Sequence, residues 1–427
     1  MLVFRNCFYN FNFKMNRLGF VFLLLLSAIQ MQPLLVLSAE STEILESTIR
    51  TCYSYLTMDN DEMSRMRTSY KNGDSEAGIY VESLLKQCNA EIASGTLYTV
   101  VNKAVLPPSG DKHDYMSMAP YWWPDETQPG GLPYKYRDGM INPETRKANT
   151  DQDALKGAFA SIYNNGLAFY FTGDEKYRRR AIEVINTFFI DKETRMNPNL
   201  NYSQFRCGHN NNFGAPAGII IIANIYELLQ GVALLSADAG LPDYTSHGLK
   251  EWMKKYLDWM LNSKLGTAER NTKNNHGTHY DCQIIAIMLY LDDVDGVRKY
   301  IQTITMPRLA RQVAKDGSQP EELKRTKSWN YTNMNMQGFF NIALMAEKID
   351  VDLWHYSRDG QILLKSMIDW FIPYLKLEKE WSWKQIEKQQ VSRIEWCLEV
   401  AAKEYGDTRY TDIISGFKSI HKNILAK

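Results

Sequence analysis

Apolar side chains recur at every third or fourth position through most of the sequence, which is the spacing of one face of an α-helix. Segments in which apolar and polar residues alternate, as they do in half-buried strands, are scarce. The pattern predicts helices over residues 41–58, 77–94, 154–171, 175–189, 217–235, 249–261, 283–291, 297–314, 334–348, 361–371, 395–405 and 408–420. The sequence therefore predicts an all-α protein.

Short turns join neighbouring helices into antiparallel pairs. Gly173-Asp174 separates two of the predicted helices, and Gly406-Asp407 separates another two. Glycine commonly ends a helix, and aspartate commonly caps the next one. The repetition of such pairs in one chain predicts a single (α/α) toroid of about six to seven helical hairpins, in which loops carry the chemistry.

One long segment interrupts the helical pattern. Residues 106–149 are rich in proline, glycine and aromatic residues, and they include three consecutive aromatic residues, Tyr121, Trp122 and Trp123. An irregular segment of this length inside a compact domain is usually a lid or a binding loop. We expect the three aromatic side chains to stack on sugar rings and Lys112 to meet acidic groups. The alternative is that the aromatic side chains only pin the loop to the body.

The N-terminus has the features of an export signal. After Met15, an arginine precedes the apolar run 18–26, and Ser38-Ala39 offers a cleavage site with small residues. Polar residues and a proline interrupt the apolar run before it reaches the length of a membrane span. We expect a signal peptide over residues 1–39, with Met15 as a possible start, and a single domain over residues 40–427. The mature protein is then periplasmic or secreted, with no stable membrane span.

The charge balance limits the choice of partner. The chain of 427 residues has 49 basic and 49 acidic side chains, so its formal net charge is zero. This balance gives no sign of bulk electrostatic binding to nucleic acid, and we therefore expect no nucleic-acid partner. Aromatic residues reach 12%, which favours surfaces that stack on sugar rings. A polyanionic ligand would have to be held by a local cluster of polar side chains.

A polar stretch stands directly before the apolar segment 283–290. It contains Asn274, Asn275, His276 and His279. Free N–H groups and the dipole at the first turn of a helix favour negative charge. The stretch therefore predicts a site for an acidic ligand at the mouth of a buried helix, with His279 as a further candidate for substrate binding. The alternative is that Asn274 or Asn275 only caps the helix and that the histidines are satisfied core or rim residues.

Metal-binding patterns are weak. His276 and His279 have the spacing of two ligands on one helix face, with Asp281 nearby. No third ligand follows at a suitable spacing, so we expect no metal and no other cofactor. The cysteines show no zinc-site spacing, and Cys282 and Cys397 lie in apolar helical segments, where we expect them to be core residues.

Two further loops are rich in polar side chains. Residues 201–214 include Arg206 and His209 among several asparagines, and we regard both as candidate substrate-binding residues. The alternative for this loop is a cluster of Gly and Asn turns with left-handed backbone. Residues 316–331 contain a run of charges, which ordinarily forms a solvated face.

Four residues in these segments resemble the active-site set of alginate lyases on helical toroids, polysaccharide lyase families 5 and 38. They are Asn275 and His276, then Arg325 at 49 residues after the histidine, and Tyr331 six residues later. Segments 117–124 and 317–325 are similar to that family as well, and the similarity extends from about residue 106 to the end. The six-residue spacing is more similar to family 38, since in family 5 it is one residue longer.

The resemblance implies that residues 40–427 form a catalytic domain that cleaves uronic-acid polymers by β-elimination. Removal of the C5 proton and expulsion of the C4 oxygen place negative charge on the substrate carboxylate. The family implies that Asn275 and Arg325 stabilise this charge and that Tyr331 moves the protons. Arg325 and His276 would help Tyr331 to ionise. His276 would act as base on sugars that present C5–H from the opposite face.

Several alternatives stay open at this level. Alginate, as mannuronate or guluronate blocks, is the first choice of acidic polysaccharide partner, and glucuronan is the alternative substrate. A glycoside hydrolase would need a carboxylate pair, such as Asp151 or Asp153 with Glu321 or Glu322. A non-catalytic glycan-binding protein would depend on Trp122 and Trp123 instead of Tyr331. The fold alone does not choose among these functions.

Overall fold

The computed structural model describes residues 56–146, 151–236 and 240–425. The predicted signal peptide over residues 1–39 lies outside these ranges, as does nearly all of the helix predicted over 41–58. Both stay predictions.

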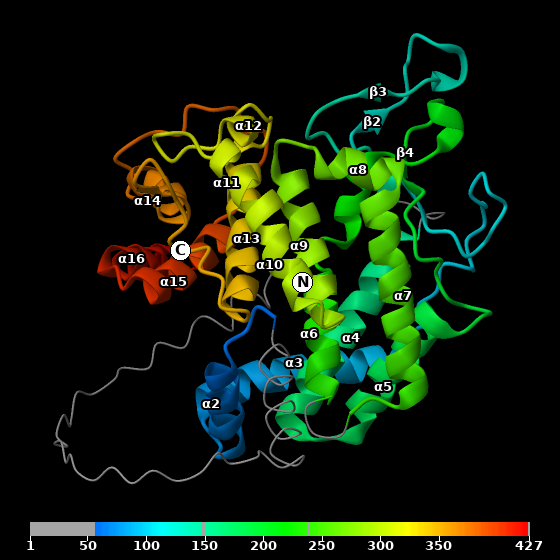
Figure 1. The fold of residues 1–427 in the computed structure, drawn as a ribbon, viewed down its shortest axis with the longest axis horizontal. Coiled ribbons are helices and arrows are strands. Elements are labelled where there is room, and N and C mark those ends of the chain that lie inside the picture. Colours follow the sequence, from blue (N-terminus) through cyan, green and yellow to red (C-terminus); the bar gives the residue numbers. More distant parts are fainter. Residues whose placement is uncertain (1–55, 147–150, 237–239, 426–427) are drawn as a thin grey trace, which may run out of the picture.

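Helices make up most of the described chain, which confirms the all-α prediction (Figure 1). They are α2 (Asn60–Lys71), α3 (Ser75–Ser94), α4 (Gln152–Thr172), α5 (Glu175–Ile185), α6 (Ile225–Ser236), α7 (Asp243–Asn262), α8 (Lys264–Arg270), α9 (Asn275–Tyr290), α10 (Val294–Tyr300), α11 (Met306–Gln312), α12 (Pro320–Leu323), α13 (Ser328–Glu347), α14 (Leu363–Leu375), α15 (Ser392–Tyr405) and α16 (Thr408–Leu425).

The helices are arranged as an (α/α) toroid, as predicted. Helices α4, α6, α9, α13 and α15 pack side by side in this order. Their partners cover them, with α5 on α4, α10 on α9, α14 on α13 and α16 on α15. Helices α8 and α12 and the strands β2 and β3 lie at one end of the molecule, and α2 and α3 lie toward the other (Figure 1). Since α9 follows α8 and α13 follows α12, both central helices begin at the first of these ends.

Turn chemistry explains why the helices pair. Gly173 ends α4 in the left-handed conformation, with φ of 72°, and the Asp174 side chain accepts a hydrogen bond from the backbone N–H of Lys176 at the start of α5. Helices α4 and α6 approach closely where two glycines meet. A Cβ atom at Gly166 would lie 2.5 Å from the carbonyl oxygen of Gly231, so a larger residue at either position would push the helices apart.

Several helix boundaries differ from the prediction. The predicted helix over 217–235 is divided into a 3-10 helix, η5 (Pro216–Ile222), and α6. The helix predicted over 297–314 contains a π-helical turn, η6 (Ile301–Thr305), which ends two residues before Pro307, a residue with no N–H for the helical ladder. Helices α9 and α13 begin eight and six residues earlier than predicted. Their first turns are polar and buried, and hydrogen bonds to other segments replace the apolar contacts on which the prediction depended. Helices α2, α8 and α12 were not predicted.

The segment 106–149 has little regular structure, as predicted. It contributes β1 (Met116–Met118), which pairs in parallel with β4 (Tyr202–Phe205), and β2 (Trp122–Trp123), which pairs antiparallel with β3 (Lys135–Tyr136). The remaining pair is β5 (Ser357–Arg358) with β6 (Gln361–Ile362). The buried side chain of Lys103 holds the base of the segment, because its Nζ forms an ion pair with Asp151 at 3.1 Å and donates to the carbonyls of Lys112 and Asp114. We call residues 116–146 the lid.

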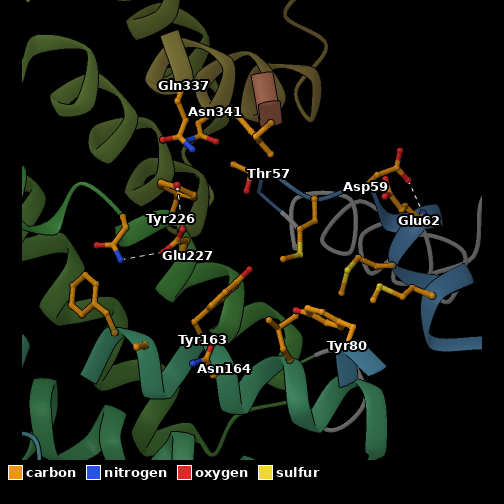
Figure 2. Close-up of a pocket in the computed structure, with 18 of the residues that line it drawn as sticks. Thr57, Asp59, Glu62, Tyr80, Tyr163, Asn164, Tyr226, Glu227, Gln337 and Asn341 are labelled. Carbon is orange, nitrogen blue, oxygen red and sulfur yellow. Dashed lines mark hydrogen bonds between the residues drawn. The ribbon is translucent and has the colours of Figure 1, made fainter. Parts of the chain in front are cut away.

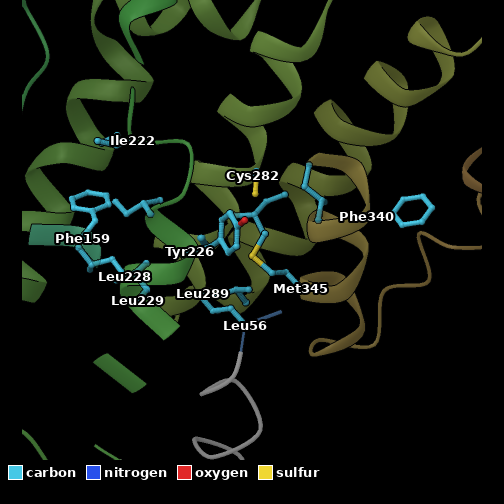
Figure 3. Packing of buried hydrophobic residues seen from close by; sticks show 14 of the residues in the cluster. Leu56, Phe159, Ile222, Tyr226, Leu228, Leu229, Cys282, Leu289, Phe340 and Met345 are labelled. Atoms are coloured by element: carbon cyan, nitrogen blue, oxygen red, sulfur yellow. The ribbon is translucent and has the colours of Figure 1, made fainter. Parts of the chain in front are cut away.

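Helix α9 lies in the centre of the core. From Asn275 to Leu289, every residue except His276 is buried. Cys282 packs among side chains of the neighbouring helices, including Tyr226 and Met345 (Figure 3), and both Cys282 and Cys397 are fully buried, as predicted. Within the described ranges, no individual helix is long and apolar enough to cross a membrane; only the bent pair formed by Asn210–Ile222 and Ile225–Ser236 has a suitable length and composition.

A buried ion pair supports the start of α9. The Nε atom of Arg308 lies 2.7 Å from a carboxylate oxygen of Asp281, and its terminal nitrogens donate to the carbonyls of Thr272 and Arg270 in the turn before α9. Gly277 leaves room for this guanidinium. A Cβ atom at Gly277 would lie 2.0 Å from Arg308 Nη1 and 2.7 Å from the carbonyl oxygen of Thr272.

Replacement of Gly277 by alanine should therefore destabilise the protein, because the guanidinium has no space into which it can move without the loss of its buried partners. We expect the free energy of unfolding to fall by about 1–3 kcal/mol, as in other overpacked sites, measured by urea denaturation. Gly78→Ala is the matched control, because its Cβ in α3 meets no atom within 4 Å and alanine favours a helix. Equal stability of Gly277→Ala and the wild type would contradict this account.

Candidate active site

The first turn of α9 joins two of the predicted catalytic residues to buried carboxylates. Asn274 caps the helix by accepting the N–H of His276, so the capping alternative is correct for this residue. Asn275 is fully buried, and it donates from its backbone N–H (2.5 Å) and from Nδ2 (2.7 Å) to the two carboxylate oxygens of Glu322. Glu322 therefore fixes the direction of the Asn275 amide.

His276 is paired with a carboxylate on α8. Its Nδ1 lies 2.6 Å from Oε1 of Glu269, which is buried, while the imidazole itself is 20% exposed. Burial lowers the pKa of His276, but the charge and hydrogen bond of Glu269 raise it by more, so the net pKa lies above the ordinary value of 6.5. The pair therefore favours an imidazolium that is held in one orientation.

Arg325 lies directly over the ring of Tyr331. The guanidinium carbon is 4.1 Å from the ring centroid, which is a cation–π geometry. The guanidinium also binds Asp138 of the lid, with 2.7 Å between Nη2 and Oδ1. Its charge acts on His276 and Glu322 as well, lowering the pKa of each. The structure thus brings together the four residues whose spacing resembles the family.

Tyr331 shares a hydrogen bond with the lid. The hydroxyl oxygens of Tyr331 and Tyr121 lie 2.6 Å apart. Burial raises the pKa of Tyr331 far above 10, Tyr121 adds to this increase, and Arg325 opposes it. The expected effect of Arg325 is present, but it does not outweigh burial, because the ring is packed under the lid. Tyr331 is therefore a phenol in this structure.

A second cluster forms around Trp122 of the lid. The guanidinium carbon of Arg206 lies 4.6 Å from the Trp122 ring centroid, and the ring of His209 meets the same indole edge-on at 4.8 Å. Tyr136 also contacts Trp122 and reaches Tyr121, which connects this cluster to Tyr331. The turn prediction also holds in this loop, since three asparagines at 210–212 have positive φ.

Three predicted substrate-binding residues lie apart from these clusters. Lys112 is exposed near the base of the lid, and its carbonyl accepts from Lys103. Trp123 donates from its indole to the carbonyl of Met140, so it is pinned to the lid itself. His279 is buried between α9 and α13, where Nε2 donates to the carbonyl of Met334. Their binding roles stay predictions.

The structure also bears on two alternatives from the sequence, a metal site and a hydrolytic pair of carboxylates. His276, His279 and Asp281 each have a different partner, namely Glu269, the Met334 carbonyl and Arg308, so they do not converge on one point. Among possible hydrolytic carboxylates, Asp151 binds Lys103 and the N–H of Met116, and Glu322 binds Asn275. Both are buried and bound within the body, whereas hydrolysis requires two carboxylates that flank the substrate bond.

A cavity of about 340 Å³ lies elsewhere in the toroid. Side chains from α2, α3, α4, α6 and α13 line it, among them Tyr80, Tyr163 and Gln337 (Figure 2). Its lining has three carboxylates (Asp59, Glu62 and Glu227), no basic side chain and none of the predicted catalytic residues. These features are unsuitable for a polyuronate, so the cavity is not the candidate active site.

Sequence reasoning missed Asp138 and Glu269 entirely and considered Glu322 only as a hydrolytic acid. Glu269 lies seven residues before His276, and an acidic residue at that distance was a usable signal once α8 was recognised. Asp138 is 187 residues from Arg325, and nothing in the local sequence marks it.

Comparisons with known proteins agree with this fold. The family model described as alginate lyase matches residues 99–381. An alginate lyase from Bacteroides ovatus is 33% identical, with a TM-score of 0.78 over 83% of this chain and 93% of that one. Alginate lyase A1-III from a Sphingomonas species has 13% identity and a TM-score of 0.51 over 85% of this chain and 91% of that one, and it shows likeness of fold alone. Comparison with curated protein sequences gives no significant match.

The toroid and the residues at its end thus define a polysaccharide lyase. More narrowly, the chain belongs to the alginate lyase family. Its placement in polysaccharide lyase family 38 stays a prediction.

Replacement of Glu269 by glutamine should remove the charge that keeps His276 protonated. We expect the pKa of His276 to fall and kcat/KM to decrease by about 10²-fold, the typical effect of losing one preorganised electrostatic group. Titration of the His276 ring signal by NMR measures the first effect, and product absorbance measures the second. Asp352→Asn, which breaks the remote and exposed pair with His355, is the matched control. An unchanged titration of His276 would refute the conclusion that Glu269 raises the pKa of this histidine.

Glu322 should make stability depend on pH. Burial raises its pKa from 4.5 to about 7, so the folded protein keeps a proton that the unfolded chain releases between these values. The contribution of Glu322 to stability is therefore present at low pH and is lost as the pH rises through about 7. Compared with the wild type, Glu322→Gln should gain stability between pH 5 and pH 8 in urea denaturation, while Glu321→Gln, at the half-exposed neighbouring position, should not. Parallel curves for Glu322→Gln and the wild type would rule out this contribution.

Proposed function

We propose that this lyase depolymerises alginate by β-elimination and leaves a C4=C5 double bond in the product. The single observation that carries the proposal is the stacking of Arg325 on Tyr331 beside the His276–Glu269 pair. This arrangement places cations and a proton-carrying phenol in one cluster, which suits a substrate with a carboxylate next to the reacting carbon. The Bacteroides ovatus protein of 33% identity is itself described as an alginate lyase, which supports this substrate.

Each group has a distinct task in the proposed reaction. The imidazolium of His276 and the guanidinium of Arg325 neutralise the substrate carboxylate as the C5 proton leaves and negative charge spreads onto that group. The amide of Asn275, at the start of α9, is the third polar group proposed to stabilise this negative charge. Tyr331 gives its proton to the C4 oxygen as the glycosidic bond breaks, because the raised pKa keeps this phenol protonated beforehand.

The C5 proton needs an acceptor in the same cluster. Tyr331 can take this role only after it has lost its hydroxyl proton to solvent, and Arg325 over its ring favours that phenolate. It then accepts the C5 proton and returns the same proton to the C4 oxygen, so the protons balance. His276 is the second candidate base, for sugars that present C5–H from the opposite side. In this role it acts as the neutral imidazole, Arg325 alone neutralises the carboxylate, and Tyr331 supplies the separate proton for the C4 oxygen. The two groups come from different helices, α13 and α9, which supports the processing of both mannuronate and guluronate.

The substrate-binding residues of the proposal come from the lid and the loop after β4. Trp122 and Tyr121 offer aromatic surface to sugar rings, and Arg206 and His209 offer donors to carboxylates of neighbouring units. An exported protein would meet such a polymer outside the cytoplasm, so we also propose the periplasmic or secreted location that residues 1–39 predict.

Ultraviolet absorbance of the conjugated product tests the proposal directly. Polymannuronate, polyguluronate and glucuronan are incubated separately with the wild type, with Tyr331→Phe and with Tyr244→Phe. We expect rising absorbance on the alginate polymers, and a loss of about 10²–10⁴-fold for Tyr331→Phe because a positioned proton donor is removed. Tyr244→Phe makes the same chemical change at an exposed position on α7 and should retain activity.

The other outcomes are distinct. Absorbance that rises only with glucuronan would replace alginate by the alternative substrate. New reducing ends without absorbance would indicate hydrolysis. A fully active Tyr331→Phe would show that the lyase is correct and the role of this tyrosine is wrong.

A further inference from the structure

We propose that Asp138 is a positioning residue, and that it couples the closed lid to catalysis by holding Arg325 over Tyr331. The inference rests on the proposed function of Arg325 and Tyr331. It assigns a role to a lid residue that lies far from both in sequence and that has no place in the family-like set of four.

Asp138 collects donors from three residues. Its carboxylate accepts from Nε and Nη2 of Arg325, from the backbone N–H and the hydroxyl of Thr326, and from the hydroxyl of Tyr136. These contacts have distances between 2.7 and 3.3 Å, and they connect the lid to the turn between α12 and α13. A carboxylate with so many donors is held in one place, and it fixes the guanidinium that it binds.

The backbone next to Asp138 is shaped for the same contact. The carbonyl of Asp138 accepts a second bond from the Thr326 hydroxyl, at 2.9 Å. Gly139 follows with φ of 73°, and a Cβ atom there would lie 2.4 Å from that hydroxyl oxygen. The close approach therefore requires glycine, and the lid docks through residues 138 and 139 as a unit.

The turn that receives the lid is supported from its other side. Thr326 accepts at its carbonyl from the N–H of Ile386, and Lys327 forms an ion pair with Glu387. The turn is thus fixed between the segment that contains Ile386 and Glu387 on one side and the lid on the other. The lid also carries Tyr121. When the lid is docked, Arg325 has its partner and Tyr331 has its hydrogen bond, so both contacts are made together.

The geometry assigns two functions to the same carboxylate. One pair of donors, from Thr326, fastens the lid, and the other pair, from Arg325, orients the guanidinium toward the Tyr331 ring. Asparagine at 138 keeps an oxygen for the Thr326 N–H but loses the charge that holds Arg325. Asp138→Asn therefore separates orientation from folding better than alanine does.

The test compares steady-state kinetics of Asp138→Asn with a matched variant, Asp369→Asn. Asp369 also accepts from an arginine and a tyrosine hydroxyl, Arg409 and Tyr410, but it lies on α14 away from the site. We expect Asp138→Asn to lose about 10–10²-fold in kcat, the effect of a misplaced catalytic group, with KM little changed. Asp369→Asn should keep the kcat of the wild type, and thermal unfolding of both variants monitors folding.

A double variant identifies the route of the effect. If Asp138 acts through Arg325, then Asp138→Asn should cause no further loss of kcat in an Arg325→Gln background. An equal loss in both backgrounds would show a general structural effect and overturn the inference. A lower KM with unchanged kcat would mean that Asp138 competes with the substrate carboxylate, and this too would overturn it. Wild-type kcat and KM in Asp138→Asn would do the same.

Failure of the proposed function gives a different pattern. A wild-type protein that yields no unsaturated product, or a fully active Arg325→Gln, refutes the catalytic assignment itself. Loss of kcat in Arg325→Gln together with a normal Asp138→Asn refutes only the role of Asp138.

Discussion

The buried ion pair between Asp281 and Arg308 supports the part of the structure on which the active site is built. It is inside the core, where loss of either partner would leave the other as an uncompensated buried charge, at a large cost in stability. Arg308 also holds the carbonyls of Arg270 and Thr272, which connect α8 to α9. Glu269 stands at the end of α8 and His276 at the start of α9, so their 2.6 Å contact depends on this turn. The proposed pairing of His276 with Glu269 in catalysis therefore depends on the packing beneath it.

The sequence was sufficient for the class of fold because the toroid is built from local signals. Hydrophobic periodicity locates helices, and the Gly-Asp turns fix their antiparallel pairing without information from distant residues. The boundaries were less predictable where a helix begins with buried polar residues. The first turns of α9 and α13 are examples: Asn275 is stable inside the protein only because Glu322, 47 residues later, accepts its N–H groups. Periodicity contains no information about such a partner.

The candidate site was likewise predictable only in part. Family spacing pointed to Asn275, His276, Arg325 and Tyr331, and the structure gathers these four residues at one end of α9 and α13. Their supporting carboxylates could not be found in this way, because support requires only a carboxylate at the right place in space, from any segment. Asp138 illustrates the limit, since it comes from an irregular lid whose path no local pattern specifies. The same limit applies to His279, which was predicted to precede the helix but lies inside α9, with its side chain toward α13.

The cations of the candidate site already have acidic partners, although the proposed substrate is a polyanion. Arg325 and His276 are each already matched by a carboxylate, Asp138 and Glu269, so the catalytic cluster does not present a large excess of positive charge to a polyanion. Preorganised groups stabilise a transition state through fixed direction, and paired cations are well suited to this because their partners hold them still. Binding then needs a different cation. Arg206 fits this need within the described chain, since it stacks on an indole, has no acidic partner and has a buried Nε without a hydrogen bond. In the proposed function, Arg206 in the loop after β4 attracts the polymer, and the residues at the start of α9 stabilise the charge that develops in the reaction.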